Sequence, residues 1–260
     1  ALQARTVRGE EVTDERRRNR DPILHRDPSR SYPLAARGEG AWICDADGKR
    51  YLDAAGGVFV VNLGHTAPSV VDAITAQASR MAFAHTAHFT TEPEEDLASR
   101  LLARAPEGMT KAWICTSGSQ ANETAIKLAR TYHLFGKEAA RVQVVSRWNS
   151  YHGSTLGALA LTGHTARREQ FVPYLAPSPK IDPPYCYRCP FGKTYPSCGL
   201  ACADALDETV TRTGPGNVSA FIVEPVSGGP LGALVPPPGY FERLREICDA
   251  ATDRDFDEND

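Results

Sequence analysis

Apolar residues recur at three- and four-residue steps in several segments of this 260-residue chain, which predicts amphipathic helices. We expect helices over 68–81, from Thr91 onward, after Ser117, over 154–161 and over 240–249. Their predicted core faces are Val70, Val71, Ile74 and Ala78; Leu97, Leu101 and Leu102; Ala121, Ala125, Leu128, Ala129 and Tyr132; and Phe241, Leu244 and Ile247.

Other segments carry the signature of strands. Short apolar or β-branched runs predict strands at 112–115, 141–145 and 220–223. The pair Asp47-Gly48 between 41–44 and 50–53 predicts a β-hairpin. Because strands alternate with helices, we expect an α/β domain with a mainly parallel sheet flanked by helices.

Composition narrows the classes of function. The net charge is −3, so electrostatics give no case for binding nucleic acid or a membrane surface. No apolar run approaches the roughly 20 residues of a membrane span, and the first residues lack the apolar core of a secretory signal. We therefore expect a cytoplasmic protein, whose cysteines are thiols or metal ligands rather than disulfides.

A small-residue turn before the third predicted helix has the character of an anion site. Ser117 can cap this helix, with Gln120 completing a capping box. Gly118 allows a ligand to approach the backbone closely. The free N–H groups of a helix N-terminus bind anions, most often phosphates. An ordinary capped helix is the alternative interpretation.

Two further loops follow predicted strands, and ligands of open α/β sheets bind at the carboxyl ends of strands. Residues 148–153 contain Tyr151 and His152, and residues 224–229 begin with Glu224. An anion cradle, an aromatic and imidazole pair and a carboxylate together suit a flat, phosphorylated, electron-accepting cofactor. Taken singly, each could be an ordinary loop residue or a helix cap.

These motifs resemble those of the class III aminotransferases, pyridoxal-phosphate enzymes of fold type I. The matching pieces occur in the order of the family and run from about Tyr32 to Asp249. They are 51–53 with Gly56-Gly57, 62–65, 117–130, 151–155 and 223–226.

The resemblance implies a binding site for pyridoxal 5'-phosphate. Gly118 and Ser119 would donate to the phosphate of the cofactor. Tyr151 would stack on its pyridine ring and His152 would border that ring. Glu224 would be the active-site carboxylate that helps to select the substrate and position the cofactor.

The resemblance also implies a reaction and an assembly. We expect transamination between an amino acid or ω-amine donor and a keto acid, in a homodimer. Val58 and Phe59 would line the substrate entrance, in this family often that of the neighbouring subunit. Gln120 and Ser227 stand where many relatives have Glu and Gln, which weakens inference about the substrate more than about the cofactor.

Two family groups have no counterpart at matching positions of the sequence. These are the Schiff-base lysine and the carboxylate that partners the pyridine nitrogen. After Asp249 the chain reads as an acidic tail without a strand pattern. We therefore expect a fold that is incomplete at the C-terminus and a chain that is inactive alone, with no catalytic residue assigned. Truncation, a frameshift and a true short paralogue remain open.

Other interpretations of the function also remain open. The chain would alternatively be a non-catalytic, cofactor-binding or dimerising paralogue. Aminomutases, decarboxylases and racemases share the same N-terminal motifs. We expect an arm over 1–30, the N-terminal part of a small domain with a dimer-contact segment over 31–90, a large cofactor-binding domain over 91–249 and a disordered tail over 250–260.

A cysteine cluster lies between the second and third loops. Cys186, Cys189, Cys198 and Cys202 have spacings that could hold zinc or an iron–sulfur cluster. The alternative is a proline-braced loop of free or redox-active thiols, with no metal.

Overall fold

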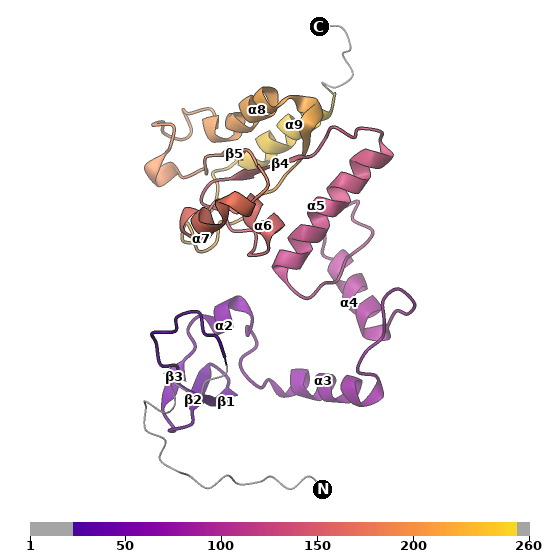
Figure 1. The fold of residues 1–260 in the computed structure, drawn as a ribbon, viewed down its shortest axis with the longest axis vertical. Coiled ribbons are helices and arrows are strands. Elements are labelled where there is room, and N and C mark those ends of the chain that lie inside the picture. The colour runs from indigo at the N-terminus through magenta and orange to yellow at the C-terminus, as the bar shows by residue number, and fades with distance from the viewer. Residues whose placement is uncertain (1–22, 254–260) are drawn as a thin grey trace. The chain divides into compact units, whose positions relative to one another are not determined.

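The computed structural model describes residues 23–253, and the chain divides between Thr91 and Glu92 into two compact units (Figure 1). The predicted arm therefore lies outside the described residues up to position 22, and the predicted tail lies outside them from position 254. No helix in the described part of the chain is long and apolar enough to cross a membrane.

The first unit contains a three-stranded antiparallel sheet of β1 (Ala35–Glu39), β2 (Trp42–Asp45) and β3 (Arg50–Leu52). The predicted hairpin is confirmed between β2 and β3. An Asp45 carboxylate oxygen fixes its turn by accepting from the Asp47 and Lys49 amides at 3.0 and 2.9 Å. The β1 strand was not predicted, because its sequence Ala-Ala-Arg-Gly-Glu has no apolar alternation and it pairs through its backbone.

A strained turn follows the sheet. In α2 (Gly56–Phe59) the φ angles of Gly56, Gly57, Val58 and Phe59 are +53, +61, +60 and +66°. A left-handed conformation costs a non-glycine residue roughly 1–2 kcal/mol. Asp53 holds the turn, because its Oδ2 atom accepts from the Gly57 amide at 2.8 Å. The α3 helix (Pro68–Arg80) completes the unit and confirms the helix predicted over 68–81.

The second unit is built on a three-stranded parallel sheet in the order β5-β4-β6, which confirms the predicted α/β class. Its strands are β4 (Gln143–Arg147), β5 (Lys180–Ile181) and β6 (Val218–Phe221). Its helices are α4 (Glu92–Leu102), α5 (Gly118–Phe135), α6 (Leu156–Leu161), α7 (Thr165–Arg168), η1 (Glu169–Tyr174), η2 (Cys186–Arg188), α8 (Ala201–Thr213), η3 (Pro215–Asn217) and α9 (Tyr240–Asp253).

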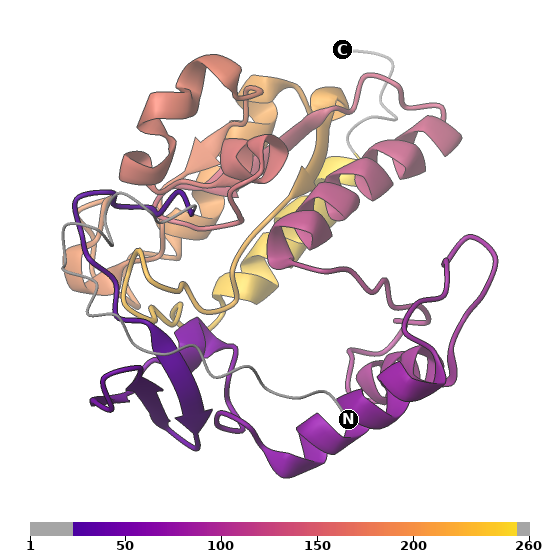
Figure 2. The same ribbon diagram turned by 60° about the horizontal axis from the view of Figure 1, so that its bottom comes forward.

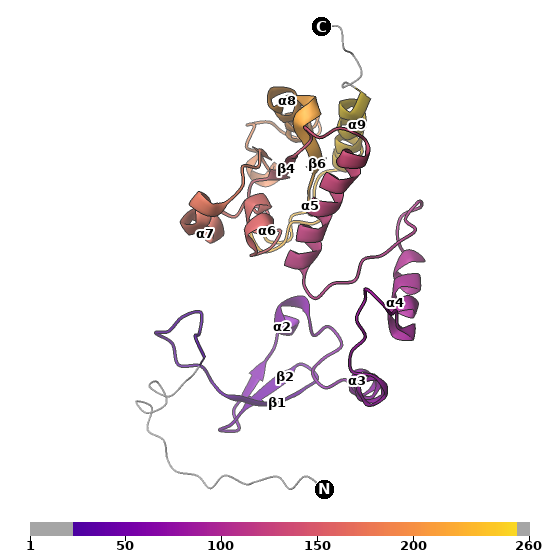
Figure 3. The same ribbon diagram turned by 45° about the vertical axis from the view of Figure 1, so that its right-hand side comes forward.

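The core of this unit lies where α8 and α9 pack together against the sheet, behind β4 and β5 in Figure 1. Leu206 of α8 and Leu244 and Ile247 of α9 are fully or nearly fully buried there, beside Val145 of β4. The α5 and α6 helices pack against each other and against the strands, as the turned view in Figure 3 shows. Helices thus flank the sheet, which Figure 2 shows from below.

The boundaries of β4, β6 and α9 differ from the predicted ones. β4 and β6 lie two residues after and two residues before the predicted runs. The α9 helix continues to Asp253, so 250–253 is not a disordered tail. Ala251 is 8% exposed and joins the core, because the helical repeat from Leu244 and Ile247 brings it onto the same face.

The strand predicted at 112–115 is wrong. Trp113 and Ile114 are 76 and 41% exposed and lie in irregular backbone. A strand needs a hydrogen-bonded neighbour, and no described segment pairs with 112–115.

The core face predicted for α5 is also wrong. Leu128 and Tyr132 are 67 and 72% exposed. The helix instead turns a more polar face inward, and His133 on that face is buried. The His133 imidazole contacts the Ser219 carbonyl oxygen at 2.9 Å and the Glu138 carboxylate at 2.8 Å. These polar contacts tie that face of α5 to β6 and to the loop that follows the helix.

The predicted core faces of α3 and α4 are not buried either, and neither helix contains a buried residue. Ile74 is 64% exposed, and Leu97 and Leu101 are 46 and 48% exposed. Amphipathic periodicity specifies an apolar face but not the surface that covers it.

Candidate cofactor site

The N-terminus of α5 has the predicted cap. The Ser117 hydroxyl oxygen accepts from the Gln120 amide at 3.2 Å. The side chain of Gln120 accepts from the amide and the hydroxyl of Thr116 at 3.1 and 2.6 Å, so the reciprocal bond goes one residue further back than in a capping box. A Cβ atom added to Gly118 would meet nothing within 4 Å, so the space beside this turn is open.

The loop of Tyr151, His152 and Gly153 lies against the first turns of α5. The Ser154 amide donates to Ser119 Oγ at 3.1 Å, and Asn122 Nδ2 donates to the His152 carbonyl oxygen at 2.5 Å. Gly153 makes the approach possible, because a Cβ atom there would lie 2.6 Å from Ser119 Oγ. Two of the three predicted loops are therefore joined.

His152 is held as a neutral, buried imidazole. His152 is only 6% exposed. Its backbone amide donates to Thr162 Oγ1 at 2.9 Å. Burial, with the positive charges of Arg147 and Lys180, lowers its pKa from 6.5 to about 4. Its Nε2 atom has no hydrogen-bond partner among the described residues.

The third loop is tied to the end of β4 through Arg147. The Arg147 Nη2 atom donates to the Glu224 carbonyl oxygen at 2.9 Å and to Ser227 Oγ at 3.1 Å. The Glu224 Oε2 atom is buried without a partner in the described part of the chain. Arg147 was not among the predicted site residues. It lies two residues beyond the predicted strand 141–145, as a charged residue with no motif of its own.

The remaining predicted residues lie in different units of the chain: Tyr151 in the second, and Val58 and Phe59 in the first. Tyr151 is 40% exposed and has the Arg167 guanidinium 5.0 Å from its ring centroid. Val58 and Phe59 belong to the first unit and are 73 and 80% exposed in the left-handed turn. Hydrogen bonds thus join the N-terminus of α5 to the loop of Tyr151 and His152, and Arg147 at the end of β4 joins that strand to the loop of Glu224.

The chemistry of these groups fits a phosphorylated, polar ring. Ser119 Oγ accepts from Ser154, so its own proton is free to donate to an anion. The open space beside Gly118 admits a phosphate at the helix N-terminus. The unpartnered Nε2 atom of His152 and Oε2 atom of Glu224 are buried polar groups that a ligand with hydrogen-bonding atoms would satisfy.

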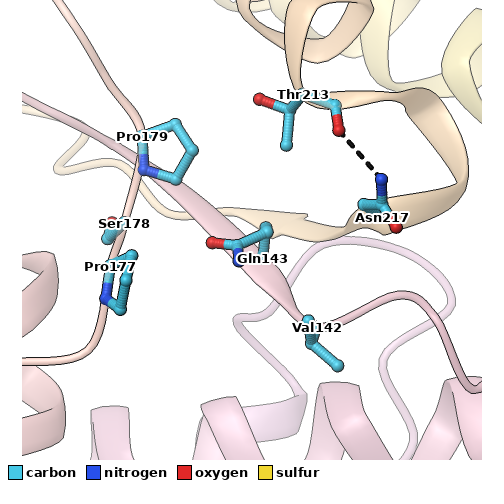
Figure 4. A pocket seen from close by; sticks show the side chains of 7 residues that line it. All are labelled: Val142, Gln143, Pro177, Ser178, Pro179, Thr213 and Asn217. Carbon is cyan, nitrogen blue, oxygen red and sulfur yellow. Dashed lines mark hydrogen bonds between the residues drawn. The ribbon is translucent and has the colours of Figure 1, made fainter.

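A cavity of about 460 Å³ lies elsewhere, lined by Val142, Gln143, Pro177, Ser178, Pro179, Thr213 and Asn217 (Figure 4). Gln143 begins β4 and Asn217 directly precedes β6, so this cavity is at the amino ends of the strands. Asn217 Nδ2 donates to the Thr213 carbonyl oxygen at 2.9 Å on one side of it. The three loops lie at the carboxyl ends, where ligands of such sheets bind.

Comparison with known families gives the site its context. The family model described as "Aminotransferase class-III" matches residues 26–252. The chain belongs to the class III aminotransferases. Members of this family depend on pyridoxal phosphate, and the family named from the resemblance is confirmed, as is its fold type I.

Individual relatives agree with this assignment. The uncharacterized aminotransferase YodT of Bacillus subtilis is 37% identical over 220 residues, which are 85% of this chain and 49% of that protein. The adenosylmethionine-8-amino-7-oxononanoate aminotransferase of Geobacter sulfurreducens is 34% identical over 83% of this chain and 48% of its own length. The chain spans about half the length of the curated relatives it matches.

A solved structure shows the same fold. The omega transaminase of Pseudomonas jessenii, in complex with PMP, aligns with a TM-score of 0.84 at 27% identity. The alignment covers 93% of this chain and 54% of that structure.

Proposed function

We propose that this chain provides the phosphate and ring contacts of a site for pyridoxal-phosphate-dependent transamination between an amino acid or ω-amine donor and a keto acid. One observation carries the proposal. The N-terminus of α5 is hydrogen-bonded to the loop of Tyr151 and His152, and the loop after β6 is hydrogen-bonded to Arg147, at the carboxyl end of β4 from which the loop of Tyr151 and His152 begins.

Each residue has a distinct part in the proposed site. The Gly118 backbone and the Ser119 hydroxyl hold the phosphate, and Tyr151 stacks on the ring. His152 stays neutral at neutral pH, so it offers a hydrogen bond without adding positive charge. Glu224 supplies the negative charge that positions the ring and selects the substrate. The bound cofactor supplies the electron sink for the carbon that carries the amino group.

We further propose that the chain does not catalyse transamination by itself. Lys180 has an unusual pKa, but we do not assign it as the lysine that forms the Schiff base with the cofactor. Burial, with the charge of Arg168, lowers its pKa to about 8. Its ammonium nevertheless donates to the Ala160 and Ser178 carbonyl oxygens at 2.8 and 3.2 Å. These two hydrogen bonds give Lys180 a structural role, because its ammonium group is already engaged by backbone carbonyl oxygens.

A homodimer with substrate-lining Val58 and Phe59 is part of the same proposal. Strained backbone clusters at functional sites, and these two apolar residues are exposed on such a turn. The exposed apolar faces of α3 and α5 supply surface for association.

In this proposal 31–90 belongs to the small domain and 91–249 to the cofactor-binding domain. The proposed location is cytoplasmic.

The cofactor site is tested by titrating the 260-residue chain with pyridoxal phosphate and with pyridoxal, which lacks the phosphate. Ser119→Ala should weaken binding of pyridoxal phosphate about 10- to 100-fold, because a hydrogen bond to a charged group contributes roughly 1.5–3 kcal/mol. Its affinity for pyridoxal should barely change. Ser99→Ala, an exposed serine of α4, is the matched control. Equal affinity of the unsubstituted chain for the two ligands would overturn the phosphate assignment.

Two further measurements test the remaining parts. Borohydride reduction of the chain with pyridoxal phosphate should leave no single lysine stoichiometrically modified, and peptide mapping that finds one would contradict the proposed inactivity. Sedimentation equilibrium should give a dimer mass. A monomer at all accessible concentrations would refute the homodimer and leave the cofactor assignment standing.

A further inference from the structure

The predicted cysteine cluster is gathered around one small cavity. Cys186, Cys189, Cys198 and Cys202 all line it, with proline and aromatic side chains completing the wall. Cys186 is exposed, Cys189 and Cys198 are half-buried, and Cys202 is buried at the start of α8. Cysteines separated by as many as 16 positions therefore face the same space.

The size of the cavity limits what the thiols can bind. Its volume is about 10 Å³, and a cavity needs about 10–15 Å³ to hold one water molecule. A small-molecule ligand is too large for this space. Within residues 23–253, no group of three or more His, Cys, Asp or Glu side chains is arranged to hold a metal ion. The remaining possibility for the four cysteines is a reaction between their own thiols.

The thiols also influence one another electrostatically. Burial raises the pKa of Cys186, and its neighbours Cys198 and Cys189 raise it further. Burial raises the pKa of Cys202 to about 11, and Cys186 and Cys198 add to that effect. Of the two thiols that act on Cys186, Cys198 has the larger effect, and both residues line the same small cavity.

We propose that Cys186 and Cys198 form a reversible disulfide by exchange with a small-molecule disulfide such as oxidised glutathione. One cysteine thiolate attacks the glutathione disulfide, forming a mixed disulfide and releasing one glutathione thiolate. The second cysteine then attacks the protein sulfur of that mixed disulfide and releases the second glutathione. The two protein thiols lose two electrons and two protons, and one glutathione disulfide becomes two glutathione thiols.

The disulfide would restrain the backbone that leads into α8. It closes the chain from η2 to the turn before this helix, where Gly199 and Leu200 are left-handed with φ angles of +58 and +60°. Cys202 and Leu206 of α8 belong to the core that α8 shares with α9. Because cross-linking restricts the unfolded chain, oxidation should raise the melting temperature of the second unit by several degrees.

The test uses the 260-residue chain incubated with oxidised glutathione and then alkylated. Thiols counted after denaturation should fall from the seven of the sequence to five, because one disulfide uses two. Non-reducing peptide mapping should join Cys186 to Cys198, and dithiothreitol should restore all thiols. Persistent glutathione adducts without a cross-link, or stoichiometric zinc or iron in the protein as purified, would overturn the proposal.

Variants assign the pair independently. Cys186→Ser and Cys198→Ser should each abolish the cross-link and the upward shift of the melting temperature. Cys189→Ser should retain both, as should the matched control Cys115→Ser, which lies outside the cluster. A cross-link that disappears in Cys189→Ser contradicts the assignment. Mapping of the unsubstituted chain decides the matter if a variant does not fold.

Discussion

Mild acid is expected to destabilise the second unit through His152. The imidazole has a folded pKa of about 4, against 6.5 for the unperturbed group. Above pH 6.5 both states are neutral and the full contribution to stability is present. As the pH falls, the unfolded chain takes up the proton first, so unfolding becomes more favourable until about pH 4.

The magnitude follows from the two pKa values. Each pKa unit corresponds to about 1.4 kcal/mol, so the full loss is about 3 kcal/mol. At pH 5 the expected loss is about 2 kcal/mol. The carboxylates with lowered pKa values, Asp45, Asp53 and Glu138, have ordinary values of 3.8, 3.8 and 4.5. Their contributions are present above those values and are lost in stronger acid, which separates them from the window of His152.

Urea unfolding between about pH 7.5 and pH 5 measures the effect, as the change of free energy of unfolding with pH. His152→Gln should lose most of this pH dependence. His164→Gln, another histidine of the same unit, is the matched control and should retain it. If His152→Gln and the unsubstituted chain showed the same loss between those pH values, the burial argument would be refuted.

Three other substitutions test the construction of the site. Gly153→Ala should lower the free energy of unfolding by roughly 2–4 kcal/mol, because its Cβ atom would lie 2.6 Å from Ser119 Oγ at a φ of +137°; an unchanged urea midpoint would contradict the close approach. Asn122→Ala should cost about 1 kcal/mol by removing the bond to the His152 carbonyl oxygen, and amide hydrogen exchange should rise in that loop rather than elsewhere. Ser117→Ala should cost about 1 kcal/mol through the lost helix cap, measured by circular dichroism during thermal unfolding, and no change would show that the cap is replaced by solvent.

Local signals predicted half of the elements of the second unit, whereas β5, α7, α8 and the three 3-10 helices were not predicted. Capping chemistry located the start of α5, and apolar runs located β4 and β6 within two residues. Parallel pairing follows from the alternation of strands and helices, because a crossover helix returns the chain in the same direction. The segment at 112–115 shows the limit of this reasoning, since an apolar run becomes a strand only where a neighbour supplies hydrogen bonds.

The site was predicted in part. Motif resemblance identified the residues of three loops; hydrogen bonds join two of these loops directly and tie the third to the end of β4 through Arg147. It did not indicate Arg147, because a charged residue just after a predicted strand has no local signature of the carbonyl and hydroxyl that it reaches 77 and 80 positions later. The roles of Val58 and Phe59 stay predictions.

The sequence by itself determined the family, the helix N-terminus at Ser117 and the alternation that makes the sheet parallel, because these depend on residues close together in the chain. Only the tertiary structure decided which face of α5 is buried and which polar groups surround His152. Burial and desolvation depend on what packs against a side chain, and for His152 those neighbours include Thr162 and Lys180, ten and 28 positions away.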